Sequence, residues 1–381
     1  MTAIATALQA GLPALLADIE ELVRTESPSD DLAAVTDCAR VVAALGTRLT
    51  GTAPEWIDGS GRPALRWRFG SGDRVLLLGH FDTVWPVGSL AGHPFQVTDG
   101  RLTGPGCFDM KAGVVQMFHA LSVLDDLDGV SVLLTGDEEI GAPTSRTLIE
   151  DEARRTGAVL VLEASEGGAL KTARKGMSGY ELTIAGRAAH AGLEPHRGVN
   201  TTTELAYQVL ALSALADPAA GTTVTPTVAS SGTTRNTVPD TARLLVDVRV
   251  ATAAEQDRVD RAVRGLPPVV EGASLTFSGG PNRPPLPVTA SAELFELARD
   301  HYAELGFGTL RGVAVGGASD GNLTAGVGTP TLDGLGAVGG GAHADDEHVV
   351  VAELPRRTAL VAALVASLIS GPSAVPGRVE P

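Results

Sequence analysis

The stretch Val-Leu-Leu-Leu-Gly-His-Phe-Asp-Thr-Val, residues 75–84, decides the fold class of this chain. Its first four residues form an unbroken apolar run, which is typical of a strand covered on both faces in a parallel sheet. His80 and Asp82 follow directly, and because side chains alternate along an extended chain, these two point to the same side. Open α/β sheets bind ligands at the carboxyl ends of their strands. The stretch therefore predicts a central strand with a candidate site at its end.

Strands and helices alternate around this strand. The spacing of apolar residues predicts two amphipathic helices before it and further helices near residues 110–124 and 144–156. Two more apolar runs, at residues 130–135 and 158–164, predict buried strands. Such alternation is typical of an α/β fold with a mostly parallel central sheet and flanking helices.

The pattern changes between residues 175 and 283. Longer alternating segments such as YELTIAG and TARLLVDVRV predict half-buried strands, separated by two predicted helices. A segment rich in Pro and Gly follows and reads as a return linker. We therefore predict an inserted α+β domain at residues 175–283, between two parts of the α/β domain at residues 1–174 and 284–381.

Composition excludes several classes of function. The 381 residues carry 45 Asp and Glu against 29 Lys and Arg, a net charge of −16, so we expect neither nucleic-acid nor membrane partners. The longest uncharged run near the C-terminus has only about a dozen strongly apolar residues, fewer than the roughly 20 of a membrane span. The N-terminal segment lacks a basic region and reads as an amphipathic surface helix. These features predict a cytoplasmic protein.

Several carboxylates follow the predicted strands. Asp109, in the glycine-rich segment 104–111, is either the N-cap of the next helix or a metal ligand. Three consecutive acids at residues 137–139 follow the strand at 130–135 and are either solvated loop acids or site residues. Glu163 ends an apolar run, where an unpaired charge would be costly, and should have a cationic partner.

Two histidines complete the set. Considered one at a time, His80 and His343 are most simply interpreted as ordinary loop histidines. His343 lies in a segment that follows a glycine-rich stretch. Because only two cysteines are present, a four-thiolate zinc site is excluded and any metal must use imidazole and carboxylate ligands. Two histidines and several carboxylates near strand ends are typical of a two-metal hydrolytic site.

Motifs between residues 79 and 349 extend this set of residues. They are GHFDTV (79–84), GPGCFDMKAG (104–113), GDEEIGAPTSR (136–146), LEAS (162–165), GRAAHAG (186–192), RNTVPD (235–240), DVRV (247–250), GGASD (316–320) and GAHADDEHV (341–349). With these motifs the chain resembles the co-catalytic zinc exopeptidase family that includes glutamate carboxypeptidase, acetylornithine deacetylase and succinyl-diaminopimelate desuccinylase. The resemblance covers nearly the whole chain and is closest to the glutamate carboxypeptidase branch.

The resemblance implies two divalent metal ions per chain, with zinc favoured and cobalt or manganese possible. It implies that Asp109 bridges the two ions, and that the remaining ligands are His80 and Glu163 for one ion and Glu139 and His343 for the other. It implies that Asp82 assists catalysis by orienting His80, and that Glu138 is the general base that passes a proton from the attacking water to the leaving amine.

The resemblance also implies functional residues in the inserted domain, which it identifies as a lid and dimerisation domain. His190 is expected to stabilise the oxyanion in the site of the other subunit, although it also reads as a polar loop residue. Candidates for binding the substrate are Asn236, Arg249 and Arg283 in this domain and Gly317 in the second part of the α/β domain. Arg249 has an alternative partner in Asp247.

We therefore expect metal-dependent hydrolysis of a peptide or N-acyl amide bond beside a free α-carboxylate. The resemblance favours a carboxypeptidase that releases a C-terminal amino acid such as glutamate. An N-acyl-amino-acid deacylase or a dipeptidase on the same scaffold is the alternative, and a non-catalytic binding protein is disfavoured because the ligand set and Glu138 are complete. The expected partners are a small anionic peptide or N-acyl amino acid and a second copy of the chain, bound through the lid.

Overall fold

The computed structural model of the protein describes residues 2–59 and 61–371. The end of the uncharged C-terminal run, at residues 372–377, lies outside the described residues. The chain divides into two compact units. The first comprises the described residues of Met1–Ala173, Leu286–Val315 and Ser319–Pro381, and the second comprises Arg174–Pro285 and Gly316–Ala318.

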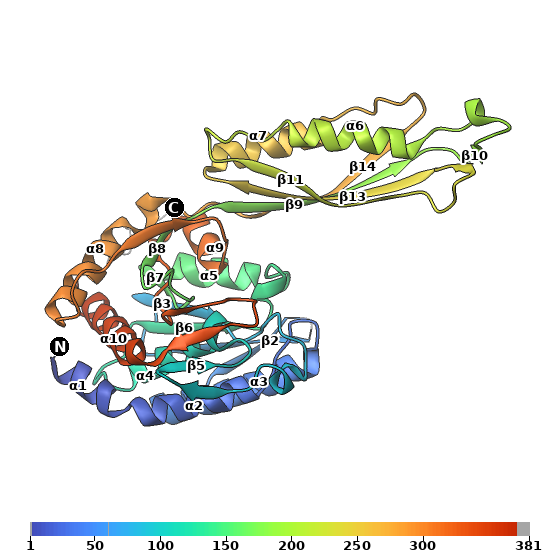
Figure 1. The fold of residues 1–381 in the computed structure, drawn as a ribbon. Coiled ribbons are helices and arrows are strands. Elements are labelled where there is room, and N and C mark those ends of the chain that lie inside the picture. Colours follow the sequence, from blue (N-terminus) through green and yellow to red (C-terminus); the bar gives the residue numbers. More distant parts are fainter. Residues whose placement is uncertain (1, 60, 372–381) are drawn as a thin grey trace. The chain divides into compact units, whose positions relative to one another are not determined.

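A six-stranded sheet forms the centre of the first unit (Figure 1). Its strands, in spatial order, are β1 (Glu55–Gly59), β2 (Arg62–Arg68), β6 (Val130–Thr135), β3 (Val75–His80), β7 (Ala158–Val161) and β16 (Thr331–Leu332). The strand β3 pairs in parallel with both β6 and β7, and β16 pairs in parallel with β7. Antiparallel pairing in this sheet involves β2, which pairs with β1 on one side and with β6 on the other. The predicted mostly parallel sheet is confirmed.

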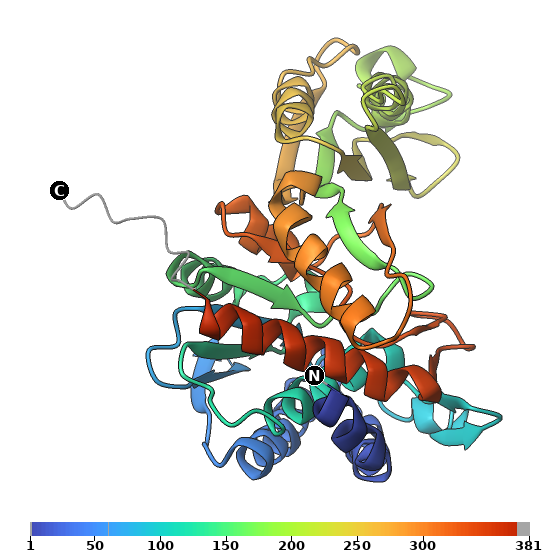
Figure 2. The same ribbon diagram turned by 90° about the vertical axis from the view of Figure 1, so that its left-hand side faces the viewer.

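Helices cover both faces of this sheet. They are α1 (Thr2–Ala10), α2 (Leu12–Arg24), α3 (Leu32–Thr50), α4 (Ala112–Leu121), α5 (Arg146–Arg155), α8 (Val288–Glu304), α9 (Asp320–Gly326) and α10 (Leu354–Ser370). Figure 2 shows α10 beside α8, and the two helices are in contact. Every residue of β3 is buried: Val75 and Leu77 pack in the core with α2, α3, α4 and α10, whereas Leu76 and Leu78 pack with α5 and α9. Burial on both faces explains the unbroken apolar run.

Two smaller sheets complete the first unit. One has the order β17 (Gly339–Gly340), β18 (His348–Val350), β5 (Arg101–Thr103) and β4 (Gln96–Thr98). Because β18 pairs with β5, it brings the segment after residue 340 beside the segment that begins at Gly104. The other sheet pairs β8 (Leu170–Arg174) with β15 (Gly312–Val315).

The second unit is a four-stranded antiparallel sheet with two helices. Its strand order is β11 (Thr223–Ser231), β13 (Thr241–Val250), β9 (Gly176–Ala185) and β14 (Ser274–Arg283). The helices α6 (Thr201–Ser213) and α7 (Ala253–Arg264) lie on the same face of this sheet in Figure 1. Alternate strand residues such as Leu182 and Leu244 form a separate core with Leu205 of α6 and Val259 of α7. A short ladder pairs β10 (Ala189–His190) with β12 (Thr237–Val238). The predicted α+β character of this region is confirmed.

Among the described residues, no single helix has the length and apolar content needed to cross a membrane. One pair, Ala3–Ala10 with Leu12–Arg24, meets the criteria of length and composition jointly but is bent by 56°. Leu15, Ile19 and Leu22 of that pair pack in the core of the first unit.

Gly113 sets the closest approach of α4 to the strand end that carries Glu163. A methyl group at this position would lie 2.1 Å from the carbonyl oxygen of Leu162. We expect Gly113→Ala to destabilise the first unit by about 1–3 kcal/mol, because this overpacking outweighs the better helix propensity of alanine. Urea unfolding followed by tryptophan fluorescence measures this, since Trp56, Trp67 and Trp85 all lie in the first unit.

Gly92 provides the control for this experiment, because a methyl group there would come no closer than 4.0 Å to any of its surroundings. Gly92→Ala should leave the unfolding midpoint close to that of the wild type. Equal midpoints for the two variants would contradict the packing argument.

Candidate metal centre

The chemically active side chains come from the ends of three adjacent strands. His80 is the last residue of β3, Glu138 and Glu139 lie in a short 3-10 turn (Glu138–Ile140) after β6, and Glu163 lies two residues beyond β7. Because β6, β3 and β7 are parallel neighbours, their carboxyl ends meet at one edge of the sheet. The sheet itself therefore brings these four residues together.

Asp109 and His343 reach the same place from loops. Asp109 lies in an irregular turn (Cys107–Lys111) just before α4, and His343 lies between β17 and β18. The N-cap of α4 is Lys111, without a capping side chain, so the N-cap interpretation of Asp109 is wrong. His343 adopts a positive φ of 62°, a backbone conformation that is strained for a non-glycine residue and clusters at functional sites.

The carboxylate of Asp109 joins two sets of ligand atoms. Its Oδ1 lies 3.5 Å from His80 Nε2, which in turn lies 3.4 Å from Glu163 Oε1. Its Oδ2 lies 3.4 Å from His343 Nε2, which lies 3.3 Å from Glu139 Oε2. Each imidazole therefore faces one oxygen of Asp109 and one further carboxylate.

These separations fit metal coordination. Ligand atoms bound at about 2.1 Å in a tetrahedral arrangement lie about 3.4 Å apart, whereas hydrogen-bonded atoms normally lie about 2.7–3.2 Å apart. Within the described residues, His80 Nε2 and Glu139 Oε1 are buried without a hydrogen-bond partner. One potential ligand atom from each of His80, Glu138 and Glu163 also lies within 4.8 Å of the other two. The donor set suits a divalent cation with nitrogen and oxygen ligands.

The charges of the site also favour cations. Although burial acts in the opposite direction, the imidazoles of His343 and His80 hold the pKa of Asp109 below its ordinary value. The neighbouring carboxylates of Asp109 and Glu139 raise the pKa of His343 to about 10. Burial raises the pKa of Glu139. The concentrated carboxylates thus stabilise positive charge, which protons or divalent ions can supply.

Asp82 contacts both His80 and the acidic turn, an arrangement that the sequence did not reveal. His80 Nδ1 lies 3.0 Å from the backbone oxygen of Asp82 and 3.4 Å from its carboxylate, so the backbone is the nearer acceptor. The carboxylate itself is fully buried and accepts hydrogen bonds from Ser29 Oγ and from the backbone N–H groups of Glu138 and Glu139. One residue therefore orients both the imidazole and the acidic turn.

Asp137 differs from the two acids that follow it. It is buried, and its carboxylate accepts hydrogen bonds from the backbone and hydroxyl groups of Thr144 and Ser145. It therefore anchors the loop between the 3-10 turn and α5. The interpretation of this acid as a solvated loop residue is wrong. In the sequence, the only hint of its hydrogen bonds is the presence of two hydroxyl residues, Thr144 and Ser145, seven and eight positions later.

Two of the predicted lid residues lie together in the second unit. His190 and Thr237 are cross-strand partners in the short ladder, and the backbone oxygen of Asn236 accepts a hydrogen bond from Ala191 N. His190 is exposed, and its Nδ1 accepts hydrogen bonds from Gly192 N and Leu193 N. In the neutral ring the proton is therefore on Nε2, where it is available for donation.

The other candidates for substrate binding have different surroundings. Arg249 Nε and Nη2 donate to both carboxylate oxygens of Asp247, so the alternative partner is the one observed. Arg283 is buried, and its Nη1 donates to Asn282 Oδ1. The backbone oxygen of Gly317 accepts a hydrogen bond from Arg174 Nη1.

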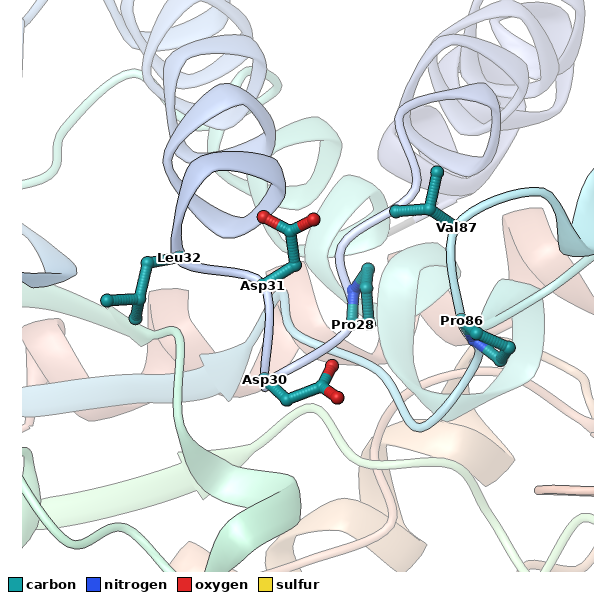
Figure 3. A pocket seen from close by; sticks show the side chains of 6 residues that line it. All are labelled: Pro28, Asp30, Asp31, Leu32, Pro86 and Val87. Atoms are coloured by element: carbon teal, nitrogen blue, oxygen red, sulfur yellow. The ribbon is translucent and has the colours of Figure 1, made fainter.

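A pocket of about 440 Å³ lies at the surface of the first unit, lined by Pro28, Asp30, Asp31, Leu32, Pro86 and Val87. Figure 3 shows that the first four come from the start of α3 and the segment before it, and that Pro86 and Val87 face them from another loop. Ser29, between two lining residues, donates to the buried carboxylate of Asp82. The pocket wall is thus attached to the segment that carries His80.

A mostly parallel α/β sheet with two linked imidazole–carboxylate sets at its strand ends is the architecture of a metal-dependent hydrolase. Residues 76–367 match the sequence profile of Peptidase family M20/M25/M40, and the chain belongs to this family, whose members are metal-dependent. The resemblance inferred from the motifs is confirmed.

Similar proteins include several hydrolases. Carboxypeptidase G2 of Pseudomonas sp. is 31% identical over 94% of this chain and 90% of its own length. Succinyl-diaminopimelate desuccinylase of Methylorubrum populi is 30% identical over 77% of this chain and 82% of its own length. The crystal structure of aminopeptidase PepT from Bacillus cereus matches with a TM-score of 0.75 and 22% identity, covering 94% of this chain and 99% of that one.

Proposed function

We propose that this protein is a two-metal carboxypeptidase that releases a C-terminal amino acid, such as glutamate, from a peptide or N-acyl amino acid. The observation that carries the proposal is the Asp109 carboxylate, whose two oxygens each face an imidazole and thereby link two ligand sets. The greater extent of the match to carboxypeptidase G2 supports the choice of reaction.

In this proposal His80, Asp109 and Glu163 hold one ion, and Asp109, Glu139 and His343 hold the other. Two divalent ions at these positions, zinc in the first place, would lower the pKa of a water molecule and polarise the scissile carbonyl. Glu138 then accepts the proton of the attacking water and transfers it to the leaving amine. Asp82 keeps the Glu138 backbone and the His80 ring in place.

The second unit supplies groups for the substrate in the same proposal. Asn236 and Arg249 bind the free carboxylate, with Asp247 keeping the guanidinium in position. Arg283 and Gly317 are further candidates in this proposal, with Arg283 Nη1 donating to Asn282 Oδ1 and the backbone oxygen of Gly317 accepting from Arg174 Nη1. Local cations matter here because a chain with a net charge of −16 repels an anionic substrate.

We further propose that the protein is a homodimer that pairs through the second unit, which acts as the lid. Apolar side chains are exposed on this unit at Leu193, Tyr207, Leu210 and Val228. Tyr207 and Leu210 lie one turn apart on α6, and Val228 lies on β11, an edge strand in contact with α6. An exposed edge strand beside apolar side chains is a surface that pairing would cover.

A hydrolysis screen tests the reaction. Purified protein supplied with Zn²⁺ or Co²⁺ is incubated with N-acyl amino acids, folyl-glutamates, dipeptides and succinylated amines, and the released amine is measured. Release of C-terminal glutamate with the highest kcat/KM supports the proposal. Preferred cleavage of succinylated amines would favour the desuccinylase alternative suggested by the relatives at about 30% identity, and preferred cleavage of dipeptides would favour a dipeptidase.

Metal content provides a direct prediction. Active protein should contain close to two divalent ions per chain and should lose activity to a chelator, because five side chains form two ligand sets that share Asp109. Elemental analysis measures the content. His343→Ala should lower it to about one ion, since that imidazole belongs to one set only.

His348→Ala is the matched control, because this imidazole lies five residues away and faces the backbone oxygen of Asp346 instead of the site. Active wild-type protein without metal, or an unchanged content in His343→Ala, would contradict the assignment.

A further inference from the structure

Glu347 is a fully buried carboxylate with four hydrogen-bond donors. Its Oε1 accepts from the backbone N–H groups of Phe108, at 2.9 Å, and Asp109, at 3.0 Å. Its Oε2 accepts from Gly106 N, at 2.9 Å, and from Trp85 Nε1, at 2.7 Å. A buried carboxylate is costly unless it is hydrogen-bonded, so this arrangement holds all four donors firmly.

The donors come from segments that surround the metal centre. Trp85 lies five residues after His80, the turn at residues 106–109 ends at Asp109, and Glu347 itself lies four residues after His343. The strand β18 begins directly after Glu347 and pairs with β5, which ends directly before Gly104. Paired strands and a buried carboxylate thus fix these segments relative to each other.

The position of Asp109 depends most directly on this carboxylate. The hydrogen bond from Asp109 N to Glu347 fixes the backbone that bears the shared side chain. The short segment between Glu347 and His343 fixes the imidazole that faces this side chain. The separation of 3.4 Å between His343 Nε2 and Asp109 Oδ2 is therefore maintained by a residue that lies outside the ligand set.

We propose that Glu347 is a positioning residue that sets the geometry between Asp109 and His343. The inference rests on the proposed function, in which these two residues hold the same ion. Glu347 is not a ligand in this proposal, and it acts only through the backbone of the turn at residues 106–109 and through the segment that carries His343.

Glu347→Gln tests the proposal with little change of shape. The amide keeps one accepting oxygen, but its NH₂ group faces two of the four donors and cannot accept from them. Metal-free protein is titrated with Co²⁺, and two binding constants are obtained from the visible absorption spectrum. We expect at least one constant to weaken by about 10- to 100-fold, as is usual when a residue supporting a metal ligand is removed. The Co²⁺ spectrum should change, and kcat should fall more than KM rises.

Glu353→Gln is the control, because this glutamate lies six residues away and forms an ion pair with Arg356 instead. It should leave both constants, the spectrum and kcat unchanged. Wild-type constants in Glu347→Gln would overturn the positioning role while leaving the proposed function standing. Wild-type protein that takes up no Co²⁺ would overturn both.

Trp85→Phe keeps the test decisive if Glu347→Gln does not fold. It removes one donor and retains the three backbone donors, so one Co²⁺ constant should weaken by about tenfold, the lower end of the usual range. Two unchanged constants in this variant would also overturn the proposal.

Discussion

Glu138→Gln is expected to lower kcat by about two to four orders of magnitude while the protein keeps its fold and its full metal content. Glutamine cannot accept the proton of the attacking water, so the loss falls on the chemical step. The backbone N–H of Glu138 still donates to Asp82 in this variant, and the 3-10 turn should therefore stay in place.

Glu139→Gln is the matched comparison, because the two acids are neighbours in the same turn and both backbone N–H groups donate to Asp82. Glu139 Oε2 lies 3.3 Å from His343 Nε2, which places it in one ligand set. Its replacement should therefore remove about one ion per chain in addition to lowering activity.

Elemental analysis and steady-state kinetics on both variants measure these effects. The structure makes the comparison necessary, since Glu138 also lies within ligand reach of His80 and Glu163. Equal metal loss in the two variants would show that the base and the ligand have been assigned the wrong way round.

His190→Ala is expected to lower kcat by about two to three orders of magnitude, the usual cost of removing one donor to a developing oxyanion. The exposed ring donates through Nε2 when neutral, because Nδ1 is occupied by Gly192 N and Leu193 N. His196→Ala is the control, since His196 is an exposed histidine of the neighbouring turn Pro195–Arg197 and should be replaceable without loss.

Mixed dimers test whether His190 acts in the partner's site. Chains with His190→Ala and chains with Glu138→Ala are unfolded and refolded together, so that each heterodimer carries one site with both residues intact. Random pairing in a two-fold dimer should restore about a quarter of wild-type activity. Heterodimers that form but remain as inactive as the parent variants would place His190 in its own subunit's site or remove it from catalysis.

Local patterns explain why so much of the fold was predictable. The apolar run at residues 75–78 indicates a doubly covered strand because burial on both faces leaves no room for polar side chains. The same reasoning placed His80 at the end of a strand and the acidic turn after β6. The sequence could not divide the acids at 137–139 by role, because the hydrogen bonds that bury Asp137 come from residues seven and eight positions away in a folded loop.

Contacts between distant segments explain the rest. The nearer acceptor for His80 Nδ1 proved to be the backbone oxygen of Asp82, and the carboxylate of Asp82 serves Ser29 and the acidic turn. No periodicity in the chain encodes these choices, since they depend on how the loops at the carboxyl end of the sheet pack against each other.

The sequence alone determined the α/β fold class, the family and the kinds of ligand atom near the strand ends. It could do so because strand periodicity and residue chemistry are local properties. Only the tertiary structure decided that the two oxygens of Asp109 face different imidazoles. It also decided that Glu347, 238 residues along the chain from Asp109, holds the backbone of that residue. The physical reason is that pairing of β18 with β5 brings the two segments together, and hydrogen bonds act over ångströms in space regardless of separation in sequence.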